Sequence, residues 1–152
     1  MYFFERNKEF KDNIICIDDS GRKYTYLQIW DMGDELTSNK RERELVLLQC
    51  SNDVESLASY LALLRKRCPV ILMGRDVEQT LVEGIRQKYR PDEKPEKDAA
   101  EIYPELGLLL STSGSTGAQK LVRLSYDNIQ ANCDSIVEYL GLTADERPIT
   151  TL

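Results

Sequence analysis

The sequence contains no histidine, and its four cysteines show no CxxC spacing. Both facts argue against a zinc site, and the lack of histidine argues against a Cys/His or Ser/His catalytic arrangement. Cys50 and Cys68 lie at or beside apolar runs, so we predict that they act as small core residues.

Long apolar runs are also missing. The longest, such as LVLL and PVILMG, are far too short to cross a bilayer, and the N-terminal stretch MYFFERNKEFKDN mixes acids and bases unlike a signal peptide. We therefore predict a cytoplasmic protein with no membrane span. The net charge of -6 argues against a nucleic-acid partner, and we interpret the basic groups RKR at 65–67 and KRER at 40–43 as solvated helix ends.

What the chain does contain is a regular alternation of strand and helix signals. NIICIDDSGRKYTY, at 13–26, predicts a β-hairpin turning at Asp19-Ser20-Gly21. Apolar runs at 44–50, at 68–74 and around LGLLLS predict strands that are buried on both sides. Strands that alternate with amphipathic helices predict an α/β fold with a doubly wound, mostly parallel sheet and flanking helices.

Helix start signals separate these strands. Thr25 with Gln28 and Asn52 with Glu55 match the capping box, and Asp76 can cap a third helix. We expect Trp30, Gly33 and Leu36 on the inner face of the first helix. Asp53 and Glu55 resemble an acid/base pair, but a helix N-terminus explains acidic residues there better.

A last helix follows residue 125. Ser125 is its predicted cap and Gly141 its C-terminal stop. Its predicted inner face carries five residues at helical spacing: Ile129, Cys133, Ile136, Val137 and Leu140. The chain ends in DERPITTL, which we interpret as the start of a strand that has been cut.

The segment most indicative of chemistry is STSGSTGAQK, which follows the third predicted strand. Ligands gather at the carboxyl ends of strands in open α/β sheets. Gly114 and Gly117 can adopt positive φ and expose consecutive backbone N–H groups to an anion. Hydroxyl groups and a lysine add further donors, and together these features favour a polyphosphate; the side chains are those of Thr112, Ser113, Ser115, Thr116 and Lys120.

Two familiar phosphate motifs do not fit this segment. The P-loop requires G-x-x-x-x-G-K-[ST] opening a helix, but here the spacing is Gly114-x-x-Gly117-x-x-Lys120, and a β-prone run follows. The dinucleotide fingerprint G-x-G-x-x-G fails because position 112 is threonine. On composition alone, a plain flexible turn also remains open.

The segment resembles the phosphate-binding loop of the adenylate-forming (AMP-binding) superfamily, which includes acyl-CoA synthetases, amino-acid adenylation domains and luciferase-like ligases. That loop reads T-S-G-[ST]-T-G-x-P-K-G. The flanking segments YTYLQI, SYLALLRKRCPVILM and LSYDNI resemble the family in the same order. The matching loop residues are Thr112, Ser113, Gly114, Ser115, Thr116, Gly117 and Lys120.

The resemblance implies an ATP- and Mg2+-dependent acid–thiol ligase. Such an enzyme adenylates a carboxylate substrate, releases pyrophosphate and, in many cases, transfers the acyl group to the thiol of CoA or of a carrier-protein pantetheine. The implied role of the loop and Lys120 is to hold the β- and γ-phosphates of ATP and to stabilise the departing pyrophosphate.

The chain also departs from the family pattern. Gln119 replaces the usual proline, Leu121 replaces the usual glycine, and Tyr126 stands where a histidine is frequent. Loss of the proline removes a fixed φ angle, and Leu121 is expected to lengthen the following strand. Tyr126 either lines the nucleotide site or packs in the first turn of its helix.

The resemblance also implies that the chain is the N-terminal portion of a large AMP-binding domain. Its expected parts are a hairpin at 1–26, βαβ units at 27–111, the phosphate-binding loop at 112–120 and an apparently truncated strand–helix–strand at 121–152. No catalytic set is complete in it and no metal site is predicted, so we expect the fragment alone to be inactive. The alternative is a stand-alone regulatory module that binds a nucleotide or phosphate without turnover.

Overall fold

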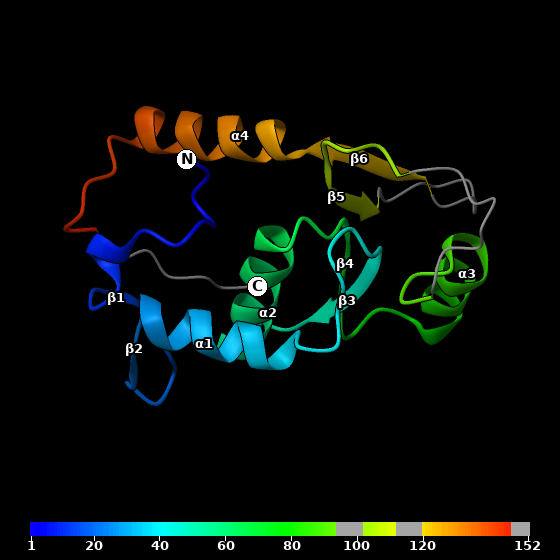
Figure 1. Cartoon of the computed structure of the whole chain (residues 1–152), viewed down its shortest axis with the longest axis horizontal. Helices are drawn as coiled ribbons and strands as arrows, with labels where there is room; N and C mark the ends of the chain where they lie inside the picture. The colour runs from blue at the N-terminus through cyan, green and yellow to red at the C-terminus, as the bar shows by residue number, and fades with distance from the viewer. Residues whose placement is uncertain (94–101, 112–119, 147–152) are drawn as a thin grey trace.

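The computed structural model describes residues 1–93, 102–111 and 120–146 (Figure 1). None of the helices in these ranges has the length and apolar composition that a bilayer crossing requires. In chain order the elements are η1 (Lys8–Phe10), β1 (Ile14–Ile17), β2 (Lys23–Thr25), α1 (Tyr26–Leu36), β3 (Val46–Cys50), α2 (Val54–Arg65), β4 (Val70–Gly74), α3 (Gln79–Tyr89), β5 (Leu106–Ser111), β6 (Leu121–Ser125) and α4 (Tyr126–Leu140).

Four strands form the central sheet in the order β3-β4-β5-β6. The β3–β4 and β4–β5 pairs are parallel, whereas β5 and β6 are antiparallel. β1 and β2 form a separate antiparallel hairpin. The predicted α/β fold, with a mostly parallel sheet, flanking helices and an N-terminal hairpin, is confirmed, and β6 makes the sheet a mixed one.

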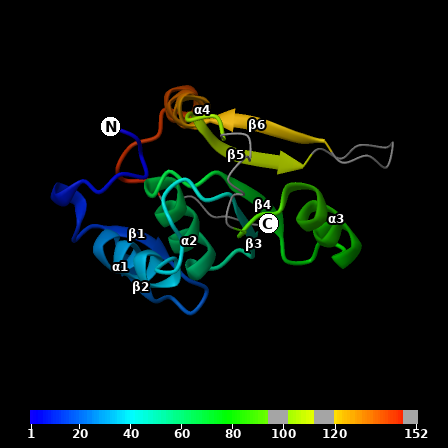
Figure 2. The same ribbon diagram turned by 45° about the vertical axis from the view of Figure 1, so that its right-hand side comes forward.

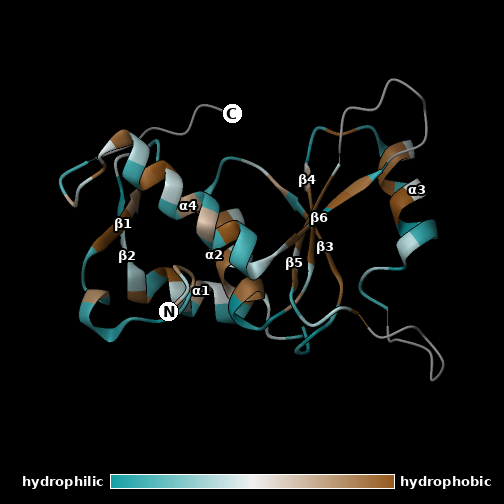
Figure 3. Ribbon diagram, turned by 90° about the horizontal axis from the view of Figure 1, so that it is seen from above, coloured by the Kyte–Doolittle hydropathy of each residue, from teal (hydrophilic) through white to brown (hydrophobic). Residues whose placement is uncertain are grey.

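Helices cover both faces of this sheet because successive strand side chains point to opposite sides. Val46, Val70 and Leu108 belong to one apolar cluster, which includes residues of α1, α2 and α4. The neighbouring strand residues Leu47 and Ile71 belong to a second cluster with α3. Figure 3 shows this division, with α3 on one side of the strands and the other three helices on the opposite side.

Helices α2 and α3, which follow β3 and β4, lie on opposite faces of the sheet. From β3 the chain passes through α2 to the adjacent parallel strand β4. After α3 it returns to the outer edge of β3, where the N–H of Asp92 donates to the carbonyl of Leu45 at 2.8 Å.

Helices α1 and α2 approach closely at Gly33. A Cβ at this position would lie 2.4 Å from the carbonyl oxygen of Ala58 in α2. Ile29 and Trp30 on the same face are buried. Leu36, predicted to share that face, is 47% exposed, because the last residue of α1 lies beside a surface cavity along β3.

Some of the observed helix caps are those predicted from the sequence, and others are not. The capping box of Thr25 and Gln28 is present, and Gly141 ends α4 in the left-handed region at φ 61°. The cap of α2 is Asp53, which accepts from the N–H of Ser56, so the box predicted at Asn52 and Glu55 is wrong by one residue.

The cap predicted for α3 is also wrong. This helix begins at Gln79 after Glu78, whose side chain makes no capping hydrogen bond, and Asp76 lies before it. The N–H of Val77 instead bonds back to Gly74, so a turn directly after β4 occupies the position where the sequence predicts the cap.

Helix α4 is buried only near its start. Ser125 caps it as predicted, with Asn128 completing a capping box, and Ile129 is buried. Farther along the predicted inner face, Ile136 is 45% and Leu140 60% exposed. The predicted burial of this stripe is therefore wrong in the second half of α4, because that half extends beyond the strands it packs on (Figure 1).

Candidate functional site

The candidate phosphate loop joins β5 to β6. Ser111 ends β5, Leu121 begins β6, and these two residues are paired in the antiparallel register. Figure 2 shows the two strands side by side, with β5 pointing toward this connection. Lys120 directly precedes β6 and is exposed. The other predicted loop residues lie outside the described residues, so their role stays a prediction: Thr112, Ser113, Gly114, Ser115, Thr116 and Gly117.

The element after the loop separates this site from the two motifs rejected on spacing. A P-loop or dinucleotide-binding loop opens a helix, whose N-terminus faces the phosphate. Here Leu121–Ser125 form a strand, as the β-prone sequence predicts, and Leu121 is its first residue. Any phosphate bound at this loop would therefore depend on loop N–H groups and side chains, without a helix directly after the loop.

Other polar groups lie where β3 and β4 end, at the same edge of the sheet. The N–H of Arg75 donates to the carbonyl of Cys50, and its guanidinium lies 3.6 Å from the carboxylate of Asp53. Cys50 is half-buried, whereas Cys68 at the opposite end of the sheet is fully buried as predicted. Within the described residues, no three His, Cys, Asp or Glu side chains gather as a metal site.

Asp53 is an ionised helix cap and not half of an acid/base pair. Burial opposes its ionisation, but hydrogen bonds from Ser56 and the charge of Arg75 outweigh burial and lower the pKa of Asp53. A carboxyl group with a lowered pKa is a poor general base near neutral pH. The helix N-terminus interpretation is confirmed.

Tyr126 packs in the first turn of α4, which confirms one of the two roles left open by the sequence. It is 1% exposed, and burial raises the pKa of its hydroxyl to about 12. Its ring lies over Gly107 of β5, where a Cβ would come within 2.9 Å of the ring. The hydroxyl has no hydrogen-bond partner in the described part of the chain.

The basic group at 65–67 lies at the end of α2 as predicted, but its residues are half-buried and not solvated. The group at 40–43 lies between α1 and β3, so it is not a helix end, and Arg41 and Glu42 in it are exposed. Arg65 forms an ion pair with Asp34 of α1, and Lys66 donates to the carbonyl of Thr37. Arg43 donates to the carbonyls of Ile102 and Pro104, just before β5. These cations join distant segments, which charge pattern alone does not reveal.

Arg67 is the residue of greatest interest that the sequence did not single out. Its guanidinium carbon lies 4.7 to 5.5 Å from the centroids of three aromatic rings, those of Tyr2, Phe4 and Tyr126. The only signal in the sequence was a cation before a proline-bearing turn, in a chain whose first residues are aromatic.

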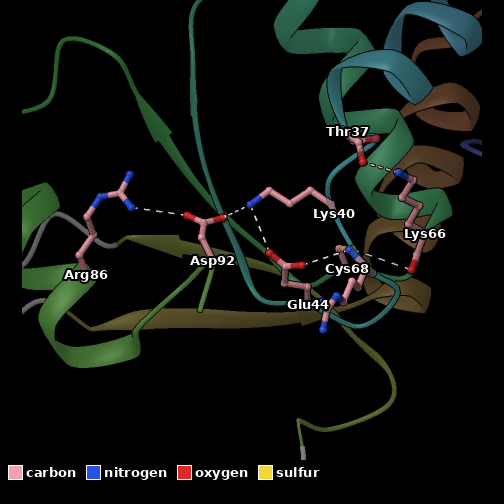
Figure 4. Close-up of polar contacts among 8 residues, drawn as sticks. Thr37, Lys40, Glu44, Lys66, Cys68, Arg86 and Asp92 are labelled. Atoms are coloured by element: carbon pink, nitrogen blue, oxygen red, sulfur yellow. Dashed lines mark hydrogen bonds and ion pairs between the residues drawn. The ribbon is translucent and has the colours of Figure 1, made fainter. Parts of the chain in front are cut away.

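A second polar cluster lies near the amino end of β3, away from the candidate loop (Figure 4). The ammonium of Lys40 lies 2.6 Å from Asp92 and 3.2 Å from Glu44. Burial opposes the charged form of Lys40, but the two carboxylates outweigh it and raise the pKa of Lys40. A cavity of about 230 Å³ lies next to this cluster and is lined by Leu36, Thr37, Lys40, Val46, Leu47, Leu48, Ser59, Leu63 and Asp92.

This cavity is small for a ligand site, since such pockets usually span about 300–1,000 Å³. Lys40 is paired with carboxylates on both sides, and Asp92 also lies 3.5 Å from Arg86. The cluster holds the segment that follows α3, which contains Asp92, against β3. The carboxyl edge of the sheet therefore remains the better candidate site.

No protein-family model and no curated protein sequence matches this chain. The fold, by contrast, matches solved structures of adenylate-forming enzymes, as the loop sequence predicts. Apo MatB from Rhodopseudomonas palustris superposes with a TM-score of 0.72 at 16% identity, over 90% of this chain. VinN in complex with L-aspartate gives 0.71 at 18% identity over 88% of this chain, and E. coli MenE gives 0.65 at 20% over 86%.

The matches cover only part of each solved chain. This chain spans 36% of MatB, 50% of VinN and 35% of MenE. At these identities the likeness establishes the fold and not the activity. Activity has to be argued from the loop and its position on the fold.

Proposed function

We propose that the chain is the N-terminal part of an ATP-dependent ligase that adenylates a carboxylate and releases pyrophosphate. The observation that carries this proposal is the TSGSTG-x-x-K sequence at the carboxyl end of β5, between two antiparallel strands, in a fold shared with adenylate-forming enzymes. A structure of MatB with ATP bound also matches, with a TM-score of 0.69 over 84% of this chain. It supports ATP as the nucleotide.

In the proposed reaction, the loop from Thr112 to Gly117 holds the β- and γ-phosphates with backbone N–H groups and hydroxyls. The substrate carboxylate attacks the α-phosphorus, and the bond to pyrophosphate breaks. Lys120 provides a positive charge without bidentate geometry, which suits a phosphate group that moves as it departs. Mg2+ bound to ATP would neutralise further charge on the phosphates.

We further propose that the acyl group of the adenylate is transferred to a thiol, either of CoA or of a carrier-protein pantetheine, in the cytoplasm, with release of AMP. The remaining catalytic groups would then lie in polypeptide outside these 152 residues. In this proposal one larger domain contains the hairpin at 1–26, the βαβ units at 27–111, the loop at 112–120 and a strand–helix–strand segment at 121–152.

Carboxylate-dependent exchange of radiolabelled pyrophosphate into ATP, measured on the intact protein, tests the proposal directly. L-aspartate and 3-methylaspartate, the ligands of the VinN complexes, are the first carboxylates to assay, followed by dicarboxylates and fatty acids. Exchange that requires both ATP and one carboxylate is expected. ATP hydrolysis without exchange for any carboxylate would contradict adenylate formation.

The Lys120→Ala variant tests the role of the loop cation. We expect the exchange rate to fall about 100-fold, the usual effect of removing one stabilising group from a developing anion. Lys23→Ala is the matched control, because Lys23 is an exposed lysine of the distant hairpin. Equal rates for the two variants would show that the charge of Lys120 has no part in pyrophosphate departure.

A further inference from the structure

Arg67 lies at the centre of a cluster that joins three separate parts of the chain. Its guanidinium lies against Tyr2 and Phe4 of the N-terminal segment and against Tyr126 at the start of α4. It also forms an ion pair with Glu5 at 3.2 Å. We call Tyr2, Phe4, Arg67 and Tyr126 the arginine–aromatic cluster. A cation held against several rings is favourable when it is partly removed from water.

The backbone of Arg67 indicates that its side chain matters. Arg67 follows α2 and has φ 57°, in the left-handed region that favours glycine. Its N–H closes the turn by donating to the carbonyl of Leu64 at 2.9 Å. A non-glycine residue in this region, as at Arg43, Arg90 and Asp92, costs backbone free energy that surrounding contacts have to offset. Here the three rings and Glu5 supply the compensating contacts.

The cluster reaches the β5–β6 pair through Tyr126. The Tyr126 ring covers Gly107 of β5, and the backbone N–H of Tyr126 donates to the carbonyl of Glu105 at 3.0 Å. The register of β5 and β6 shifts between Leu106 and Leu108, around that glycine. Tyr126 therefore contacts the end of the β5–β6 pair opposite the loop, where both strands join the rest of the fold.

The N-terminal segment closes the cluster from the other side. The Tyr2 hydroxyl donates to Asp127 at 2.6 Å, and the N–H of Phe3 donates to Gln130 at 2.8 Å. Phe4 is 2% exposed and packs against both Tyr2 and Tyr126. These contacts hold α4 and the base of the β5–β6 pair against the end of α2.

We propose that Arg67 is a positioning residue for the phosphate loop. Through Tyr126 it fixes the base of the β5–β6 pair, and thereby the positions of Ser111 and Lys120, which flank the candidate loop. The expected effect of Arg67 on ATP binding rests on the function proposed above. The mechanical part of the proposal, that Arg67 orders β5 and β6, does not rest on it.

Hydrogen–deuterium exchange of the intact protein without nucleotide tests the mechanical part. In Arg67→Gln we expect exchange roughly tenfold faster in peptides covering 106–111 and 121–125, with little change in α1. Arg67→Lys, which keeps the charge, should restore part of the protection. If Arg67→Gln does not fold, the Lys variant against wild type supplies the same comparison. Uniform acceleration across all peptides, or none, would overturn the proposal.

Arg6→Gln is the matched control. Arg6 also comes from the N-terminal segment, and its guanidinium carbon lies 5.7 Å from the centroid of the Trp30 ring. It forms an ion pair with Asp34, so its contacts within the described residues are with α1 and not with the β5–β6 pair. Its loss should leave exchange in 106–111 and 121–125 unchanged. An equal effect of both variants there would mean that Arg67 acts only through general stability.

The ATP dissociation constant, measured by calorimetry on the same variants, tests the link to the site. We expect roughly tenfold weaker binding in Arg67→Gln and wild-type affinity in Arg6→Gln. Unchanged affinity in Arg67→Gln, despite faster exchange in β5 and β6, would overturn that link. Absence of ATP binding in the wild-type protein would instead contradict the proposed function, and the exchange experiment would still decide the role of Arg67.

Discussion

The α1–α2 pair and the β5–β6 pair both rely on a glycine that lets a neighbour approach, but the neighbours differ. At Gly33 the neighbour is backbone, since a Cβ would lie 2.4 Å from the carbonyl oxygen of Ala58. At Gly107 it is a side chain, the ring of Tyr126 at 2.9 Å. The first contact joins two rigid helices, whereas the second holds strands that carry a candidate ligand loop. The strands that flank the loop are thus held at this point by a side chain, in addition to the backbone pairing of β5 with β4.

The largest effect expected from this comparison is that of Gly33→Ala. Backbone at 2.4 Å cannot move aside, so the helices have to separate, and we expect the free energy of unfolding to fall by about 3 kcal/mol. Gly84→Ala in α3 is the control, because no atom lies within 4 Å of a Cβ there, and it should stabilise by about 0.5 kcal/mol. Urea denaturation of both variants measures the difference; similar stabilities would contradict a tight α1–α2 contact.

The next effect compares the two halves of α4. Ile129→Ala removes a buried side chain beside β5 and should cost about 2 kcal/mol in unfolding free energy. Ile136→Ala removes a side chain that is 45% exposed and should cost less than about 0.5 kcal/mol in the same chain. Thermal denaturation distinguishes them. A cost for Ile136→Ala as large as that for Ile129→Ala would mean that the second half of α4 is covered in solution.

The smallest effect concerns Asp53 at the carboxyl edge. Its folded-state pKa is lowered, so it contributes stability above the pKa of an unfolded aspartate, and this is lost as pH falls through the folded value. Asp53→Asn keeps a capping oxygen but cannot titrate. We expect the stability lost between pH 7 and pH 2 to be smaller in the variant by about 0.5 kcal/mol, since the side chain is partly exposed. Identical acid sensitivity in chemical denaturation would disagree with this assignment.

Local signals in the sequence predicted much of the fold. The hairpin turn, the cap at Thr25, the cap at Ser125 and the stop at Gly141 were all identified, because each depends on residues within one turn. Local signals do not decide between two adjacent residues that can both cap a helix. Asn52 and Asp53 are equally good caps, and only the position of the helix against the sheet selects Asp53.

Features that depend on distant contacts were harder to predict. The periodic stripe of α4 predicts an amphipathic helix, but periodicity does not reveal how far the underlying sheet extends, so Ile136 and Leu140 were misplaced. Charge pattern alone predicts a solvated group at 65–67, because its partners, Asp34, Thr37 and the N-terminal aromatics, are remote in sequence. For the site, the position of the loop after β5 was predicted, and the anchoring of its strands by Tyr126 was not.

The pairing of Ser111 with Leu121 has a consequence for engineering. Residues paired across neighbouring strands keep their backbones roughly 5 Å apart, whatever sequence connects them. A replacement for residues 112–120 therefore has to bridge this separation to preserve the register, because loop length and turn type help to set the register of a hairpin. Chimeras that exchange only residues 112–120 under this condition would test whether the segment alone carries the proposed phosphate site.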